Sequence, residues 1–159
     1  GGAARGIAFA LADARAKTIG ITNRTIDRAM LLAADVQAAG GSAEAVIPGA
    51  SLARFDCVVN CTSIGMRGGP DPWGLPVEID RLSRDALAVD IVYIPEVTPF
   101  LAAAATGGLR TFGGLPMLIY QGALAFELWT GVNAPAEVMA VAARHELQRR
   151  ASLASGQRP

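Results

Sequence analysis

The sequence has little cysteine, few aromatic residues and no excess of charge of either sign. Its 14 basic residues balance its 14 acidic residues, so we expect no nucleic-acid partner and no role at a membrane surface. No apolar run approaches the roughly twenty residues that a membrane span needs. What remains is a 159-residue chain that is 52% hydrophobic and 18% charged, which is typical of one globular domain with a real core.

The two cysteines, Cys57 and Cys61, share one apolar run. A strand would hold them too far apart for a disulfide, and no second Cys/His cluster accompanies them, so we expect neither a disulfide nor a metal site. We interpret them as small buried thiols. Two free thiols fit a reducing, cytoplasmic compartment.

Strand and helix signals alternate along the chain. We predict strands at residues 18–22, 43–47, 56–61, 86–93 and 109–112, and helices at 3–16, from 28 to the Gly40-Gly41 pair, 99–105, 116–130 and from 135 through 147. Such alternation predicts an α/β fold, a Rossmann-like, mostly parallel sheet with helices on both faces. Residues 1–151 form the single predicted domain, and residues 152–159 are expected to be a disordered tail.

The apolar faces of the helices are predicted from their large side chains. For the second helix these are Met30 and Leu31 with Ala34 and Val36, and for the helix at 116–130 they are Leu118, Leu124, Ala125 and Leu128.

The chain opens with Gly1-Gly2-Ala3 at the start of an Ala-rich helix. Glycines let a phosphate approach the backbone closely, and a helix N-terminus offers free N–H groups and a positive dipole end. In dinucleotide folds a buried strand feeds this turn. We therefore expect the sequence to be a fragment whose first strand is missing.

About twenty residues later, the next predicted strand ends in Asn23-Arg24-Thr25, followed by Arg28. In dinucleotide folds this strand tip reads the adenosine ribose. An acidic residue there would bind a free 2′-hydroxyl, whereas arginine suits a 2′-phosphate through charge-assisted, bidentate contacts. The stretch therefore predicts NADP as cofactor; the alternative is two solvated arginines at a helix end.

The strand at 56–61 runs into Thr62 and Ser63. Small hydroxyl residues at the carboxyl end of a parallel strand lie where open α/β sheets bind ligands. We therefore add both residues to the predicted cofactor site.

Six motifs in order give a family resemblance: Gly-Gly-Ala-Ala-Arg at 1–5, Asn23-Arg24-Thr25 with Arg28, residues 60–66, Asp90-Ile91-Val92-Tyr93, Thr98-Pro99, and Gly113-Gly114-Leu115 through Gln121-Gly122-Ala123. Together they resemble the C-terminal, NADP-binding half of shikimate dehydrogenase. The resemblance implies reversible hydride transfer between NADPH and 3-dehydroshikimate in aromatic amino-acid and chorismate biosynthesis.

The resemblance also implies roles for individual residues. Pyrophosphate would be bound by Gly1, Gly2 and Ala3, the 2′-phosphate by Asn23, Arg24, Thr25 and Arg28, the nicotinamide end by Ile91 and Gly114, and the substrate by Tyr93 and Gln121. The family usually has Asn where this chain has Ile94, and Gly where it has Pro116. Pro116 removes one backbone N–H near the nicotinamide.

The family's catalytic Lys and Asp belong to an N-terminal domain that this sequence does not contain, so we expect no catalytic residue here and no turnover by the fragment alone. The only histidine, His145, is expected to be solvated. Two alternatives stay open: a standalone NADP-binding or sensing module without catalysis, and a dehydrogenase of quinate or an analogue. A homodimer is also an open alternative.

Overall fold

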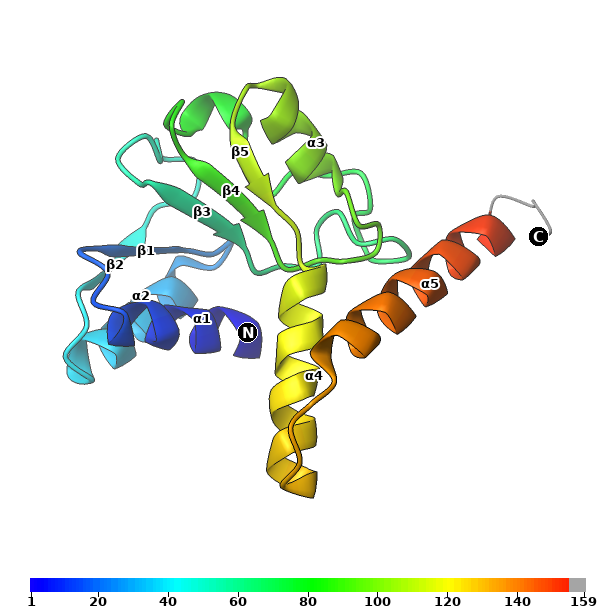
Figure 1. Ribbon diagram of the computed structural model, residues 1–159. Coiled ribbons are helices and arrows are strands. Elements are labelled where there is room, and N and C mark those ends of the chain that lie inside the picture. Colours follow the sequence, from blue (N-terminus) through cyan, green and yellow to red (C-terminus); the bar gives the residue numbers. More distant parts are fainter. Residues whose placement is uncertain (155–159) are drawn as a thin grey trace.

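A computed structural model of the chain describes residues 1–154 (Figure 1). The elements, in chain order, are α1 (Gly2–Asp13), β1 (Ile19–Thr22), α2 (Ile26–Ala38), β2 (Ala43–Val46), β3 (Cys57–Asn60), the short 3-10 helix η1 (Ile79–Arg81), β4 (Leu87–Asp90), α3 (Pro99–Thr106), β5 (Arg110–Phe112), α4 (Leu115–Thr130) and α5 (Ala136–Ala154). Every strand pairing is parallel. The predicted α/β class is confirmed.

The strands form two sheets rather than one continuous sheet. β1 pairs with β2, and the second sheet has the order β3-β4-β5. Within the described residues no strand lies between β1 and β3, so each of these two strands keeps one edge without a hydrogen-bonded neighbour.

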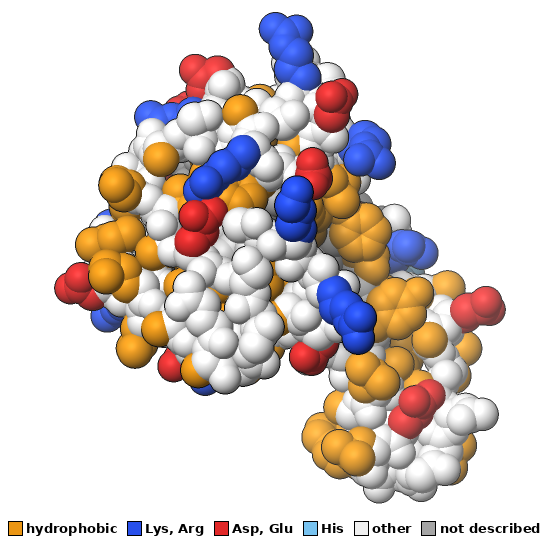
Figure 2. Space-filling view, turned by 90° about the vertical axis from the view of Figure 1, so that its left-hand side faces the viewer, with side chains coloured by type: hydrophobic (Ala, Val, Ile, Leu, Met, Phe, Trp, Pro, Cys, Tyr) orange, Lys and Arg blue, Asp and Glu red, His pale blue; other side chains and the backbone are white. Residues whose placement is uncertain are grey.

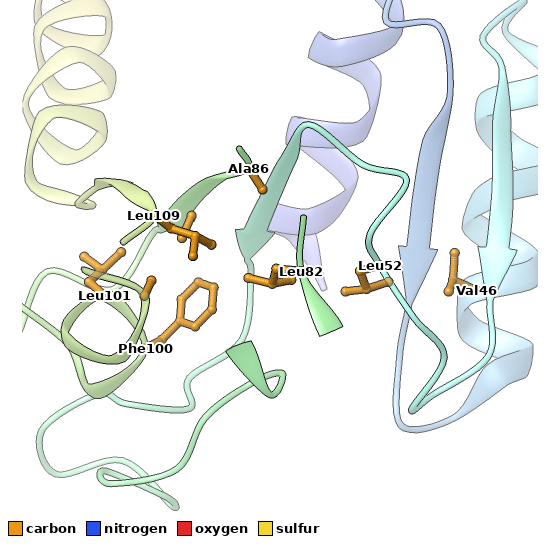
Figure 3. Packing of buried hydrophobic residues seen from close by; sticks show 9 residues of the cluster. Val46, Leu52, Leu82, Ala86, Phe100, Leu101 and Leu109 are labelled. Atoms are coloured by element: carbon orange, nitrogen blue, oxygen red, sulfur yellow. The ribbon is translucent and has the colours of Figure 1, made fainter. Parts of the chain in front are cut away.

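One apolar cluster joins the two sheets. Val46 at the end of β2, Leu52 and Leu82 from the connecting segments, and Phe100 at the start of α3 belong to the same buried cluster (Figure 3). Phe100 is completely buried. The helices α1 and α2 pack against the two-stranded sheet of β1 and β2, and α3 packs against β4 and β5 of the other sheet (Figure 1).

Small residues form the buried face of α2. Ala29, Ala33 and Val36 are buried, whereas Met30 and Leu31 are 57% and 66% exposed. The predicted face was therefore wrong for Met30, Leu31 and Ala34, and it was confirmed for Val36. Alanines at four-residue spacing let the helix lie close to β1 and β2, which leaves the larger side chains outside.

The last two helices project from the sheets (Figure 1). α4 buries Leu115, Ile119 and Ala123, so the predicted stripe through Leu124 and Leu128 was also wrong. None of the described side chains of α5 is buried. The physical reason is that α4 contacts mainly α5 among the helices and strands, and the side chains that it buries lie between Leu115 and Ala123.

Several predicted boundaries shift. α1 ends at Asp13, three residues early, because Arg15 adopts a left-handed backbone (φ 58°) and the amide N–H of Ala16 donates to the carbonyl oxygen of Leu11. α5 continues through Ala154, so residues 152–154 are helical where a disordered tail was predicted. The Ser152 hydroxyl donates to the Gln148 carbonyl within that helix. The rest of the predicted tail lies outside the described residues.

Two predicted helix ends are confirmed. The Thr98 hydroxyl accepts a hydrogen bond from the Leu101 amide as the N-cap of α3, and Gly131 ends α4 with φ 70°. None of the described helices combines the length and the apolar character that crossing a membrane requires.

Candidate functional site

A surface hollow of about 250 Å³ lies where α1 begins and β1 ends. Gly1 lines it from the start of α1, Asn23 from the turn after β1, and Arg28 from the first turn of α2. The structure thus brings together the Gly-rich turn and the arginine-bearing strand tip, which the sequence analysis placed at one ligand. Gly2 and Ala3 are exposed in the first turn of α1.

The turn after β1 is organised by its own side chain. The backbone N–H of Thr25 donates to Asn23 Oδ1 at 2.9 Å, a local contact that sets the chain up to enter α2 at Ile26. Arg24 and Arg28 are both exposed, and within the described residues neither guanidinium group makes a hydrogen bond or an ion pair. Two guanidinium groups are therefore available to an anionic ligand, although Arg24 does not itself line the hollow.

Two further charged residues line this hollow, and the sequence analysis assigned neither of them. Arg5 of α1 forms an ion pair with Asp35 of α2, and its guanidinium lies 5.0 Å from the centre of the Phe9 ring. The sequence does contain a signal that could have placed Arg5 at this hollow: it lies four residues after Gly1 and therefore on the same face of the helix. Because Asp35 already neutralises Arg5, the charge available for a ligand comes from Arg24 in the turn after β1 and from Arg28 in the first turn of α2.

At the carboxyl end of the second sheet, a buried carboxylate connects two strands. Asp90 ends β4 directly opposite Asn60, which ends β3. Asp90 is completely buried, and it accepts hydrogen bonds from Asn60 Nδ2 (3.0 Å), the backbone N–H of Val92 (2.9 Å) and Thr98 Oγ1 (2.7 Å). The sequence analysis assigned no role to the Asn60 and Asp90 side chains, and for Thr98 it predicted only the helix start.

Asn60 also shapes the turn that carries the predicted hydroxyl residues. Its Oδ1 accepts from both the backbone N–H and the hydroxyl of Thr62, and its Nδ2 donates to the carbonyl of Ile64. The Thr62 hydroxyl in turn accepts from the Ile64 amide. The Thr62 side chain thus makes its hydrogen bonds within the turn, although both Thr62 and Ser63 are exposed.

Gly114 lies against the segment that follows β4. A Cβ at this position would come within 2.3 Å of the Ile91 carbonyl oxygen and 2.8 Å of the Val92 carbonyl oxygen, so only glycine permits this approach. Ile91 and Gly114, both predicted at the nicotinamide end, are therefore neighbours at the carboxyl edge of β4. β4 ends at Asp90, so Tyr93 lies three residues beyond the strand rather than at its end, and is half-buried.

Cys61 directly follows β3 at this edge. Burial raises the pKa of its thiol, and the charge of Asp90 raises it further. The expectation of two buried thiols was wrong for Cys57, which is exposed, although partial burial and the Asp56 charge still raise the pKa of its thiol.

The remaining predicted residues lie on the projecting helices. Gln121 is exposed on α4, with no side-chain hydrogen bond within the described residues, and His145 is exposed on α5, as expected. Hydrophobic side chains gather over the far end of α4 (Figure 2), where Leu124, Leu128 and Trp129 are 67%, 83% and 82% exposed.

A second hollow, of about 390 Å³, lies between α3, β5 and the start of α4, with Arg144 of α5 at its side. None of the predicted site residues lines it. The described part of the chain contains no group of three or more His, Cys, Asp or Glu side chains that could hold a metal ion.

Comparisons with known proteins show similarity to shikimate dehydrogenases. Residues 114–144 match the family described as Shikimate 5'-dehydrogenase C-terminal domain. The shikimate dehydrogenase (NADP(+)) of Halorubrum lacusprofundi is 46% identical over 149 residues, which cover 93% of this chain and 52% of that protein. The chain spans about half the length of the curated relatives it matches.

Solved structures share the fold. The shikimate 5-dehydrogenase of Thermus thermophilus, in complex with NADP(H) and shikimate, is similar with a TM-score of 0.78 and 39% identity, covering 91% of this chain and 52% of that one. The quinate dehydrogenase of Corynebacterium glutamicum, in complex with NAD, has a TM-score of 0.79 and 31% identity, covering 88% of this chain and 50% of that one. The similarity to shikimate dehydrogenases that the motifs indicated is confirmed.

Proposed function

We propose, starting from the homology of this chain to shikimate dehydrogenases over 93% of its length, that residues 1–151 form the NADP-binding domain of such an enzyme. The activity of the whole protein would be the reversible reduction of 3-dehydroshikimate to shikimate by NADPH, a step of aromatic amino-acid and chorismate biosynthesis.

The observation that carries the proposal is the hollow between α1 and β1. The start of α1 offers backbone N–H groups to a pyrophosphate, with Gly1, Gly2 and Ala3 leaving room for it. Arg24 and Arg28 have no acidic partner within the described residues, so both are available to hold a 2′-phosphate together with Asn23 and Thr25. An acidic side chain that would favour a free ribose hydroxyl is absent from residues 23–26.

The nicotinamide end would lie at Ile91 and Gly114, beside Thr62 and Ser63. The close contact of Gly114 with the Ile91 and Val92 carbonyls gives this end a fixed backbone surface. The cofactor, when bound, supplies the hydride, and the residues here would orient it. Tyr93 and Gln121 would reach the substrate, whose proton donor and acceptor come from another part of the protein.

Two features support a further part of the protein beside this domain. The relatives are about twice as long as this chain. In addition, β1 and β3 each have an unpaired edge, and the far end of α4 exposes large apolar side chains that an adjoining domain would cover. We also propose a cytoplasmic location, supported by two free thiols, and a homodimer as the assembly to test.

The proposal is tested by titrating the chain with NADPH and with NADH. NADPH should bind at least about tenfold more tightly, because charge-assisted hydrogen bonds to the 2′-phosphate are each worth about 1.5–3 kcal/mol. Equal affinities would show that residues 23–28 do not read a 2′-phosphate.

A turnover assay tests where the catalytic groups lie. The chain alone should not oxidise shikimate with NADP⁺, and detectable turnover would contradict the assignment of catalysis to another part. The quinate dehydrogenase similarity keeps quinate as the second candidate substrate. Assaying the full-length enzyme with both compounds separates the two.

A further inference from the structure

We propose that Asp90 is a positioning residue for the nicotinamide end of the site: its buried carboxylate holds the turns after β3 and β4 and the start of α3 in one arrangement. This inference rests on the proposed function. It adds a residue to which neither the motifs nor the comparisons give a role, and it is carried by four observations.

The first observation is the strand register. Asn60 and Asp90 are directly paired residues of parallel strands, and the Ile91 N–H donates to the Asn60 carbonyl at 3.2 Å. The side-chain bond from Asn60 Nδ2 to Asp90 Oδ1 adds a second link at the same level. The two strands therefore end together, and the turns that follow them start from a fixed point.

The second observation is the link to α3. Thr98 Oγ1 donates to Asp90 Oδ2 and accepts from the Leu101 amide, so one hydroxyl connects the carboxylate to the first turn of the helix. Gly65, at φ 84°, lies against the same residue: a Cβ there would be 3.5 Å from the Thr98 Cβ. The turn after β3 is thus held from both sides, by Asn60 and by the start of α3.

The third observation is the link to the proposed cofactor contacts. Asp90 Oδ1 accepts from the Val92 N–H, which fixes the peptide between Ile91 and Val92. The carbonyl oxygens of these two residues are the groups that Gly114 packs against. A shift of the Asp90 carboxylate would therefore move Ile91 and Gly114 together.

The fourth observation is energetic. A completely buried carboxylate without a basic partner is costly for stability, and an apolar residue of similar size would often be the more stable choice. Here all the hydrogen bonds of Asp90 come from neutral donors, each on a different segment. This pattern is explained by the need to define a geometry rather than by stabilisation alone.

The test uses the chain with Thr98→Val, which has nearly the same shape but no hydroxyl, and Thr98→Ser as the matched control that keeps the hydroxyl. Two probes separate the ends of the site: adenosine 2′,5′-bisphosphate, which lacks nicotinamide, and NADPH, whose emission reports on the surroundings of its nicotinamide ring. Folding of each variant is checked by circular dichroism.

We expect Thr98→Val to weaken NADPH binding about tenfold and to return the emission of bound NADPH toward that of the free cofactor, with bisphosphate binding changed by less than about twofold. Thr98→Ser should resemble the unchanged chain. Asp90→Asn should likewise weaken NADPH binding and leave bisphosphate binding nearly unchanged. This variant provides the test of the positioning role if Thr98→Val does not fold.

Equal weakening of both probes, or no weakening of either, would overturn the positioning role. That result leaves the proposed function standing, because the unchanged chain would still bind both probes. Failure of the unchanged chain to bind the bisphosphate would instead overturn the proposed function, and this inference with it.

Discussion

The turn after β1 and the turns after β3 and β4 lie at carboxyl ends of parallel strands, but they use their polar side chains in opposite ways. Arg24 and Arg28 are exposed and have no partner within the described residues. Asp90 is completely buried and accepts three hydrogen bonds from three different segments. The arginines that follow β1 therefore remain available to a ligand, whereas the Asp90 carboxylate is hydrogen-bonded within the protein.

This difference separates two requirements of a dinucleotide site. At the proposed adenosine end, selectivity for a 2′-phosphate needs cations that meet it directly, and long arginine side chains can adjust to the ligand. At the proposed nicotinamide end, a ring must be held at a defined position for hydride transfer. A fixed backbone achieves this, and the Asp90 network with the close Gly114 contact provides one.

The largest expected effect is at the adenosine end. The double variant Arg24→Ala/Arg28→Ala should lose roughly 3–6 kcal/mol of NADPH binding free energy, since each charge-assisted contact contributes roughly 1.5–3 kcal/mol. NADH binding should barely change. Calorimetric titration with both cofactors measures this.

The control for that experiment is Arg84→Ala, an exposed arginine that precedes β4 and so lies at the opposite edge of the sheet. It should leave both affinities unchanged. An equal loss of NADPH and NADH affinity in the double variant would break the comparison, because the arginines would then not distinguish the cofactors.

The next effect is on stability, and it contrasts glycines from the two ends. Gly114→Ala should lower the free energy of unfolding by about 1–3 kcal/mol, because its Cβ would overlap backbone atoms of Ile91 that have little freedom to move. Gly6→Ala in α1 meets no atom within 4 Å and should raise it by about 0.5–1 kcal/mol, since alanine is the better helix former.

Denaturant unfolding of both variants measures these changes. Near-equal effects of the two substitutions would show that the nicotinamide end is no more rigidly packed than α1. That result would contradict the fixed backbone proposed for this end.

The smallest effect is on thiol reactivity. Cys61 follows β3 at the proposed ligand-binding edge and Cys57 begins β3 at the opposite edge, so each chain carries its own control. NADP⁺ should slow alkylation of Cys61 a few-fold and leave Cys57 unchanged. Because the pKa of each thiol is raised, both rates should be low at neutral pH and should still be rising at pH values above the usual thiol pKa of about 8.5.

Mass spectrometry of the two labelled peptides gives the rates separately. Protection of Cys57 and not of Cys61 would place the ligand at the wrong edge of the sheet.

The grouping of residues at the proposed adenosine end could be predicted from the sequence because its signal is local. Asn23, Arg24 and Arg28 lie within six residues, and the alternation of strand and helix places them at a strand end. The N-cap at Thr98 and the end of α4 at Gly131 were likewise readable from short motifs.

The Asp90 network could not be predicted in this way. Its members are Asn60, Asp90 and Thr98, which come from three segments and meet only when β3 and β4 pair in one particular register. From the sequence alone, a single Asp at a strand end could equally be a solvent-exposed side chain that contacts a ligand. Burial decides between the two, and burial depends on tertiary packing.

The predicted buried faces of α2 and α4 differ from the observed ones for a related reason. Large apolar residues mark the side of a helix that buries most surface, but in α2 the close approach of β1 and β2 selected Ala29 and Ala33 instead. On α4 the exposed Leu124 and Leu128 are the residues that we propose an adjoining domain covers.

The most direct test of the two-ended site is amide chemical-shift mapping of the chain by NMR, first with adenosine 2′,5′-bisphosphate and then with NADP⁺. We predict that the bisphosphate perturbs the start of α1 and residues 23–28 only, and that NADP⁺ additionally perturbs Ser63, Ile91 and Gly114. Identical maps for the two ligands, or perturbations that avoid residues 23–28, would contradict the account.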